Sequence, residues 1–161
     1  MNKSWIANGF TAANALFGGL SIMMSISGEY HVAAICILIG MEADAFDGRV
    51  ARALGTAGPM GVELDSLSDD ISFGVAAGAL MYSYQLRELG AFGFIPCALL
   101  GAFCAFRLAR FNVKVTSVHG YFEGLPCPTV GVIIACYVLS GVKIWNWLAM
   151  VCVLALAVLM V

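Results

Sequence analysis

Carboxylates are concentrated in one short part of the chain. Of ten acidic residues, seven lie between positions 42 and 70: Glu42, Asp44, Asp47, Glu63, Asp65, Asp69 and Asp70. Carboxylate oxygens are hard ligands that suit Mg²⁺, Mn²⁺ or Ca²⁺, and no histidine or cysteine stands among them to suggest zinc. Divalent ions held beside an arginine are typical of transfer at phosphorus, where they neutralise phosphate oxygens. The cluster therefore predicts metal-dependent chemistry at phosphorus.

The spacing of these residues predicts how helices would present them. Residues four apart lie on one face of a helix. This spacing occurs twice, next to small residues: Asp44, Gly48 and Arg52 with Asp47 and Ala51 alongside, and then Gly61, Asp65 and Asp69. The connection "LGTAGP" is short, so we expect the two helices to be antiparallel neighbours. The small residues would let the backbones, or a bulky ligand, approach closely.

Four carboxylates share these two faces, and we interpret them as metal ligands: Asp44, Asp47, Asp65 and Asp69. Like charges in a poorly solvated cleft cannot all stay ionised unless a cation compensates them. A cation path through a transporter is an alternative use of such acids, although the arginine within the cluster argues against it. The other three point off the shared faces and are predicted to be solvated residues at a helix end: Glu42, Glu63 and Asp70.

The rest of the chain is strongly apolar. It has 161 residues, of which 61% are hydrophobic and 11% charged, and its mean hydropathy is +0.93. Soluble domains are about a quarter charged, so this composition predicts an integral membrane protein, with one domain over residues 1–161. The net charge of −2 and the lack of a basic cluster give no indication of nucleic-acid binding.

Apolar segments of about 20 residues can cross a bilayer as helices. Six can be drawn, at 8–27, 31–54, 60–84, 91–112, 126–142 and 144–161. Alternating patterns of the kind that mark membrane strands are absent from the sequence. The sequence therefore predicts an all-α, polytopic membrane protein with a six-helix transmembrane core. Polar Asn8, Thr11 and Asn14 interrupt the first segment, which favours a retained helix over a cleaved signal peptide.

Basic residues predict the orientation of these segments. With Lys3 inside, one side collects most of them: Arg49, Arg52, Arg107, Arg110 and Lys114, against Arg87 and Lys143 on the other. The positive-inside rule then places the carboxylates at the cytoplasmic face of the cell (inner) membrane. The chain stops at Val161 within an apolar run, so either the last helix ends flush with the membrane surface or further helices are lost by truncation.

The order D-x2-D-G-x2-A-R-x8-G-x3-D-x3-D, from Asp44 to Asp69, resembles the signature of the CDP-alcohol phosphatidyltransferases without a mismatch. Eight fixed letters over 26 positions make this pattern highly specific. Members of that family exchange the CMP of a CDP-linked lipid for an alcohol. The resemblance implies a six-helix membrane core and a homodimer.

The resemblance also implies roles for matched positions. The four aspartates would hold one or two Mg²⁺ or Mn²⁺ ions on the CDP diphosphate, with Ca²⁺ as a non-productive occupant. Asp69 would be the catalytic base for the incoming hydroxyl, since a nearby metal makes its proton easier to remove. Contacts to the CDP-lipid would come from Gly48, Ala51, Arg52 and Gly61, and from Thr11 and Asn14 of the similar N-terminal element N-x2-T-x2-N-x3-G.

Three further stretches narrow the resemblance: "LDSLSDDISFGVA", "FRLARFN" and "FEGLPCP". They are similar to phosphatidylserine synthases of the integral-membrane type, which implies CDP-diacylglycerol, L-serine and membrane lipids as partners. Those synthases usually continue beyond six helices. The sequence departs from their pattern at Ala77, where a proline is usual, which affects a helix bend rather than a ligand.

Serine would need a partner for its carboxylate. Arg107 and Arg110 lie three residues apart on one predicted helix face, and a guanidinium grips carboxylate or phosphate oxygens with two donors. We expect one of them to bind the serine carboxylate or the lipid phosphate, although Arg110 is also placed to be a positive-inside anchor. Ser66 and Asn112 are candidate polar contacts at the same site.

Other acceptors remain open at this point, namely glycerol 3-phosphate or an inositol phosphate. A phosphorylated acceptor would require extra basic residues near the site, and the chain has only eight Lys and Arg in all. An inactive relative is disfavoured, because all four aspartates are present.

Overall fold

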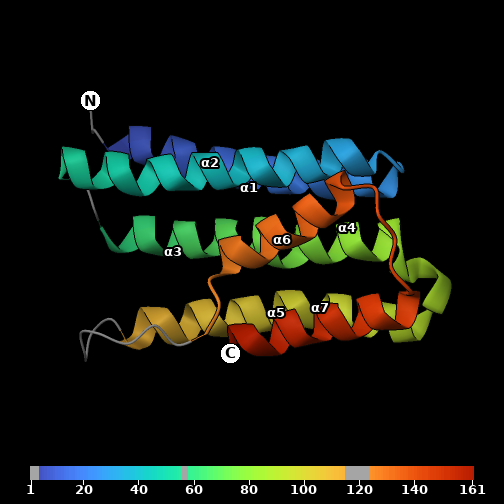
Figure 1. Cartoon of the computed structure of the whole chain (residues 1–161). Coiled ribbons are helices and arrows are strands. Elements are labelled where there is room, and N and C mark those ends of the chain that lie inside the picture. Colours follow the sequence, from blue (N-terminus) through green and yellow to red (C-terminus); the bar gives the residue numbers. More distant parts are fainter. Residues whose placement is uncertain (1–3, 56–57, 115–123) are drawn as a thin grey trace.

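The computed structural model describes residues 4–55, 58–114 and 124–161. Throughout these ranges the chain forms helices and no strand. The elements are α1 (Ser4–Ile26), α2 (Tyr30–Leu54), α3 (Pro59–Asp69), the π-helix η1 (Asp70–Val75), α4 (Ala76–Tyr84), the 3₁₀-helix η2 (Leu86–Leu89), α5 (Ala91–Lys114), α6 (Cys127–Leu139) and α7 (Asn146–Met160). Most of them run along one common direction, and α6 crosses between the pair α1 and α2 and the pair α5 and α7 (Figure 1).

The prediction of an all-helical chain is confirmed for the described residues. Helices α3, η1 and α4 follow one another without a break, so they form a single rod from Pro59 to Tyr84. Each predicted segment then corresponds to one rod or helix, with the largest boundary difference at the start of α1, which begins at Ser4 rather than at residue 8. The sequence pattern gave no sign of η1, in which hydrogen bonds skip one residue more than in an α-helix.

The connection after α2 has the residues that a helix end and a helix start require. Gly55 adopts φ +63°, a left-handed conformation that glycine reaches without strain and that commonly ends helices. Pro59 begins α3, where its missing N–H is not needed by the helix. The chain therefore reverses direction between the half of the motif with Asp44 and Asp47 and the half with Asp65 and Asp69.

Helix α1 carries its polar and small residues on the inside. Its buried positions are Thr11, Asn14, Gly18, Ser21 and Ser25. Six of its large apolar side chains are exposed: Trp5, Phe10, Leu16, Leu20, Met23 and Ile26. This distribution is the reverse of the one found on a surface helix of a soluble protein.

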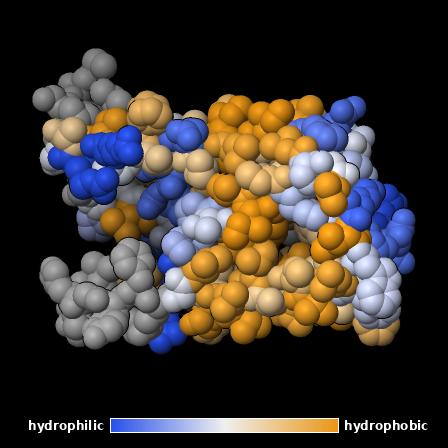
Figure 2. Space-filling model, in the orientation of Figure 1, coloured by the Kyte–Doolittle hydropathy of each residue, from blue (hydrophilic) through white to orange (hydrophobic). Residues whose placement is uncertain are grey.

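Among the described residues, two helical segments are long and apolar enough to cross a membrane, Asn8–Ile26 and Ala91–Val113. In each segment, only 28% of the most apolar 18-residue stretch is buried by the rest of the protein. Neither segment is therefore a core helix enclosed by its neighbours. On the face seen in Figure 2, hydrophobic residues form a band across the middle, and hydrophilic residues gather toward the ends of the helices.

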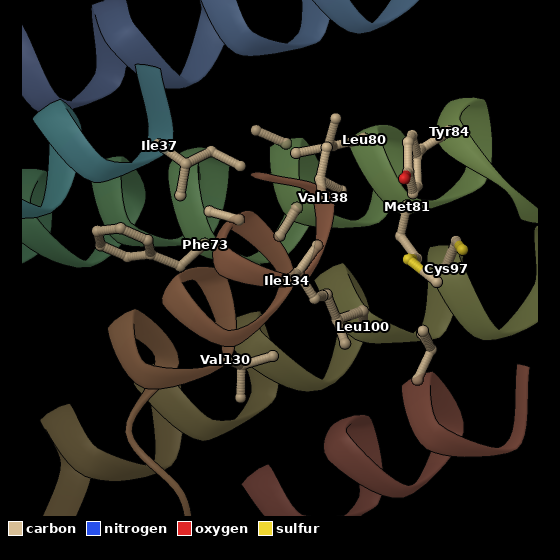
Figure 3. Packing of buried hydrophobic residues seen from close by; sticks show 14 of the residues in the cluster. Ile37, Phe73, Leu80, Met81, Tyr84, Cys97, Leu100, Val130, Ile134 and Val138 are labelled. Carbon is tan, nitrogen blue, oxygen red and sulfur yellow. The ribbon is translucent and has the colours of Figure 1, made fainter. Parts of the chain in front are cut away.

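The apolar core is built around α6. Its Val130, Ile134 and Val138 point into the space between the other helices, where they meet residues of α2, the α3–α4 rod and α5 (Figure 3). Phe73 of η1 is fully buried, and a Cβ added at Gly131 would lie 2.7 Å from its ring. Close packing of Phe73 on the α6 backbone thus fixes η1, which directly follows the last aspartate of the motif.

Candidate functional site

The motif aspartates of α2 and α3 meet. Asp44, Asp47 and Asp65 each offer a carboxylate oxygen, and these oxygens lie within 4.8 Å of one another. Asp69, one turn beyond Asp65, is within hydrogen-bonding range of Asp44. The structure thus brings together the four aspartates that the spacing placed on two helix faces.

Helix α1 holds this group of carboxylates from one side. The Thr11 hydroxyl donates to Asp47 Oδ2 at 2.6 Å, and the Asn14 amide Nδ2 donates to Asp69 Oδ1 at 3.2 Å. Both acceptor residues are buried, with 6% and 8% of their surface exposed. Thr11 and Asn14 therefore contact two of the motif carboxylates. The family resemblance implied a different contact for both residues, namely with the CDP-lipid.

The arrangement of the two carboxylate helices differs in part from the prediction. They run antiparallel, as expected (Figure 1). In the described part of the chain, however, α2 and α3 hardly pack against each other, whereas both pack against α1. The carboxylates meet because α1 joins the two helices, which the short connection alone could not reveal.

The carboxylate group fits a divalent cation. Asp65 Oδ1 is buried and has no hydrogen-bond partner among the described residues. A buried carboxylate oxygen without a partner is costly, and a bound ion removes that cost. The donors are oxygens only, which matches the preference of hard ions such as Mg²⁺, Mn²⁺ and Ca²⁺.

The motif glycines leave space beside the carboxylates. A Cβ added at Gly48 would first meet the guanidinium of Arg52, at 3.5 Å, and at Gly61 its one neighbour within 4 Å in the described residues would be Asn8 Oδ1, at 3.9 Å. In the described ranges, no backbone of a neighbouring helix approaches either glycine within 4 Å. The small residues were predicted to allow close helix packing or to leave room for a ligand, and this geometry fits the second use better. Arg52 is exposed, and the side chain of Ala51 lies outside the described residues.

Two arginines of α5 differ in their surroundings. Arg107 is half-buried, its Nη1 lies 3.5 Å from Cys127 Sγ, and its buried Nε has no partner among the described residues. Arg110 is exposed, and its Nη1 donates to the carbonyl oxygen of Val161 at 3.3 Å. Of the pair, Arg107 is the one turned toward the interior.

The two predicted polar contacts lie together. Asn112 Nδ2 of α5 donates to Ser66 Oγ of α3 at 3.0 Å. Ser66 directly follows Asp65 in the chain. This hydrogen bond links the end of α5 to the carboxylate helix. It brings the helix that carries Arg107 and Arg110 alongside the site.

Asp70 is not the solvated residue at a helix end that the sequence predicted. It lies at the start of η1, half-buried and within hydrogen-bonding range of Cys104, and its Oδ1 is buried without a partner in the described ranges. The sequence signal for this burial was the position of Asp70 directly after Asp69, a motif aspartate. Glu42 and Glu63 are exposed, as predicted.

Comparison with known proteins matches this chain to one family. The model of the CDP-alcohol phosphatidyltransferase family matches residues 4–159. A protein of Helicobacter pylori named CDP-diacylglycerol–serine O-phosphatidyltransferase is 38% identical over 137 residues, which are 84% of this chain and 58% of the relative. One of Bacillus subtilis with the same name is 39% identical over 122 residues, or 75% and 68% of the two chains.

An archaeal protein extends this set of relatives. The archaetidylserine synthase of Methanothermobacter thermautotrophicus is 39% identical over 130 residues, which are 80% of this chain and 55% of the relative. The chain thus spans between about half and two thirds of the length of these relatives. The family match covers nearly every residue that the structure describes, including the four facing aspartates. The chain therefore belongs to the CDP-alcohol phosphatidyltransferase family.

Proposed function

We propose that this chain transfers a phosphatidyl group from CDP-diacylglycerol to the hydroxyl of L-serine and releases CMP. One observation carries the proposal: four family-motif aspartates face one another, and a buried oxygen of Asp65 has no partner in the described residues. Relatives named for serine transfer in Helicobacter pylori and Bacillus subtilis support L-serine as the acceptor. Glycerol 3-phosphate and inositol phosphate have no comparable support.

The site belongs, in this proposal, to a multi-pass protein of the cell (inner) membrane. The outward-facing apolar side chains of α1 and the hydrophobic band in Figure 2 support a lipid environment. The carboxylates lie toward the end of the molecule that carries the α2–α3 connection, which we assign to the cytoplasmic side from the basic residues. We also propose a homodimer, which cross-linking in membranes tests.

The four aspartates hold one or two Mg²⁺ or Mn²⁺ ions in this proposal, and Ca²⁺ binds without turnover. When bound, such ions neutralise the diphosphate and acidify a nearby hydroxyl. The chain's own residues hold the carboxylates in place, because Thr11 restrains Asp47 and Asn14 restrains Asp69. The space beside Gly48 and Gly61 accommodates the CDP part of the lipid.

The transfer is a substitution at the phosphorus that bears the diacylglycerol. The serine hydroxyl oxygen forms a bond to that phosphorus, and the bond from phosphorus to the bridging oxygen breaks. CMP leaves with the electron pair of the broken bond, and the hydroxyl proton passes to Asp69. Asn14 donates to one Asp69 oxygen, which fixes the orientation of the carboxylate that receives the proton.

Arg107 is the proposed partner of the serine carboxylate or the lipid phosphate. Its buried Nε, without a partner in the described residues, is a donor that such a ligand would satisfy. Ser66 and Asn112 border the same region through their mutual hydrogen bond. Arg110 and Arg52, both exposed, contribute charge toward the CDP-lipid.

A transfer assay tests the proposal directly. Purified protein in mixed micelles receives CDP-diacylglycerol, Mg²⁺ or Mn²⁺, and one labelled acceptor: L-serine, glycerol 3-phosphate or an inositol phosphate. We expect phosphatidylserine and CMP in equal amounts with L-serine, and none without a metal. No lipid product with any acceptor and metal contradicts the proposed activity, and a product from another acceptor alone reassigns the substrate. Cation uptake by proteoliposomes lacking CDP-lipid would support a transporter instead.

A further inference from the structure

Two buried serines of the α3–α4 rod bond to the backbone of α1. Ser68 Oγ donates to the carbonyl oxygen of Thr11 at 3.0 Å, and Ser72 Oγ donates to that of Asn14 at 2.9 Å. Ser68 and Ser72 are 1% and 0% exposed, respectively. They lie four residues apart across the start of η1, and both face α1.

The two α1 residues that receive these bonds are the ones that touch the carboxylates. Thr11 accepts from Ser68 through its backbone and donates to Asp47 through its side chain. Asn14 accepts from Ser72 through its backbone and donates to Asp69 through its side chain. Each serine is therefore connected to one motif carboxylate through a single residue of α1.

These serine bonds are not needed to satisfy the backbone of α1. Carbonyls inside a helix already accept an N–H from four residues further along, and Thr11 and Asn14 both lie inside α1. Ser68 and Ser72 supply additional donors to the same oxygens. Their effect is to fix how far α1 is rotated and shifted against the rod.

Two glycines allow the helices to come this close. A Cβ added at Gly18 of α1 would lie 2.9 Å from Ser72 Cα and closer still to its hydroxyl. A Cβ added at Gly40 of α2 would lie 2.9 Å from Asn14 Oδ1. Real Cβ atoms do not approach backbone as closely as 2.9 Å, so α1 and η1 come this close only with glycine at position 18. At Gly40 the nearest atom is the end of the Asn14 side chain, which a Cβ would displace.

We propose that Ser68 and Ser72 are positioning residues that set the register of α1, so that Thr11 and Asn14 orient Asp47 and Asp69 for a divalent ion. This inference rests on the metal site of the proposed function. The serines touch neither carboxylate in the described contacts and act through α1.

Direct binding of Mn²⁺, followed by electron paramagnetic resonance on the purified full chain in detergent, tests this role without turnover. We expect Ser68→Ala and Ser72→Ala each to raise the Mn²⁺ dissociation constant by about three- to tenfold, the effect of losing one such hydrogen bond. The double variant should bind more weakly than either. Ser21→Ala is the matched control, because Ser21 is fully buried on α1 and its hydroxyl has no partner in the described residues.

A second pair of variants tests the close approach rather than the hydroxyls. Gly18→Ala should weaken Mn²⁺ binding, because its methyl group meets Ser72. Gly19→Ala makes the same change one residue away, where a Cβ meets nothing within 4 Å among the described residues. We expect Gly19→Ala to bind Mn²⁺ like the unaltered protein.

The outcomes separate this inference from the proposed function. An unaltered protein that binds no Mn²⁺ overturns both the metal site and the inference. Binding by the unaltered protein with equal affinity in Ser68→Ala, Ser72→Ala and Gly18→Ala overturns the inference alone, even if thermal unfolding shifts. A purely structural role predicts that second result, since it lowers stability and leaves the affinity for Mn²⁺ unchanged.

Discussion

The two ends of the helix bundle differ in how completely their polar groups are hydrogen-bonded. At the end where the α4–α5 and α6–α7 connections lie (Figure 1), Gln85 Nε2 donates to Ile144 O at 2.6 Å and to Asn146 Oδ1 at 3.0 Å. Gln85 Oε1 accepts from the Tyr137 hydroxyl at 2.5 Å. Asn146 donates in turn to Glu88 at 2.7 Å. The Ile144 N–H donates to the Tyr137 hydroxyl at 3.1 Å, so the bonds among Gln85, Tyr137 and Ile144 form a closed network.

The carboxylate end leaves buried polar atoms without partners in the described residues: Asn14 Oδ1, Asp65 Oδ1, Asp70 Oδ1 and Arg107 Nε. The hydroxyls of Ser21 and Ser25 also have no partner in the described residues, but they lie further along α1, away from the carboxylates. Buried polar groups in folded proteins are nearly always hydrogen-bonded, so a local excess of unpaired ones indicates a ligand site. We therefore expect the closed network to stabilise the fold, and the open group to bind the proposed ion and substrate.

Asp69→Asn should have the largest effect on activity. Asn14 can still donate to the new amide oxygen, so the local geometry survives while the proton acceptor is lost. We expect the transfer rate to fall by about 10²- to 10⁴-fold, the usual contribution of a general base, with CDP-lipid binding partly retained. Glu63→Gln, an exposed acid on the same helix, is the control and should keep full activity. Normal turnover in Asp69→Asn would remove the proposed base.

Asp47→Asn should weaken the binding of metal and CDP-lipid together. One of three close ligand oxygens loses its charge, so the Mn²⁺ dissociation constant should rise by more than the roughly 10- to 100-fold typical of an outer-shell change. Calorimetric titration with Mn²⁺ measures this, and Glu42→Gln on the same helix is the matched control. Unchanged Mn²⁺ affinity in Asp47→Asn would mean that the ion binds elsewhere.

Arg107→Ala should affect the acceptor rather than the metal. We expect the KM for L-serine to rise about tenfold or more if Arg107 binds its carboxylate, as the loss of a charged hydrogen bond implies. A rise in the KM for CDP-diacylglycerol instead would assign Arg107 to the lipid phosphate. Arg110→Ala, on the exposed side of α5, should change either KM far less. Equal effects of the two substitutions would contradict the inward role of Arg107.

Gln85→Ala tests the other side of the comparison. Removing the centre of the closed network should lower the free energy of unfolding by roughly 1–3 kcal/mol, because several buried groups lose partners. The Mn²⁺ affinity should not change. Asp65→Asn should do the reverse, with weaker Mn²⁺ binding and no loss of thermal stability in metal-free buffer. If both variants shifted both quantities, the two ends would not be separate in role.

The sequence predicted the positions of the helices because each apolar run is bounded by polar or glycine-rich breaks. It predicted their lengths less well, because α6 and α7, with 13 and 15 residues, are shorter than the roughly 20 residues of a spanning helix. It also predicted which aspartates would share a face, since the four-residue spacing of Asp65 and Asp69 is a property of one helix alone.

The rest depends on packing between distant segments. Thr11 meets Asp47 across 36 residues, and Asn14 meets Asp69 across 55, so local spacing carries no record of either contact. The role of α1 as the link between α2 and α3 was missed for this reason. The burial of Asp70 was missed because it depends on η1, which local propensity does not indicate.

The π-helix has a consequence for how the rod from Pro59 to Tyr84 is wound. Its wider turn lies between the carboxylate half and the half that fills the core, so the two halves are not in one helical phase. The wider turn takes up about one residue more than an α-turn, so winding Asp70–Val75 as an ordinary α-helix without removing a residue would rotate one half by up to about 100° relative to the other. Either the carboxylate oxygens or the core side chains would then face the wrong neighbours, so the wide turn is what lets both halves of the rod face their partners at once.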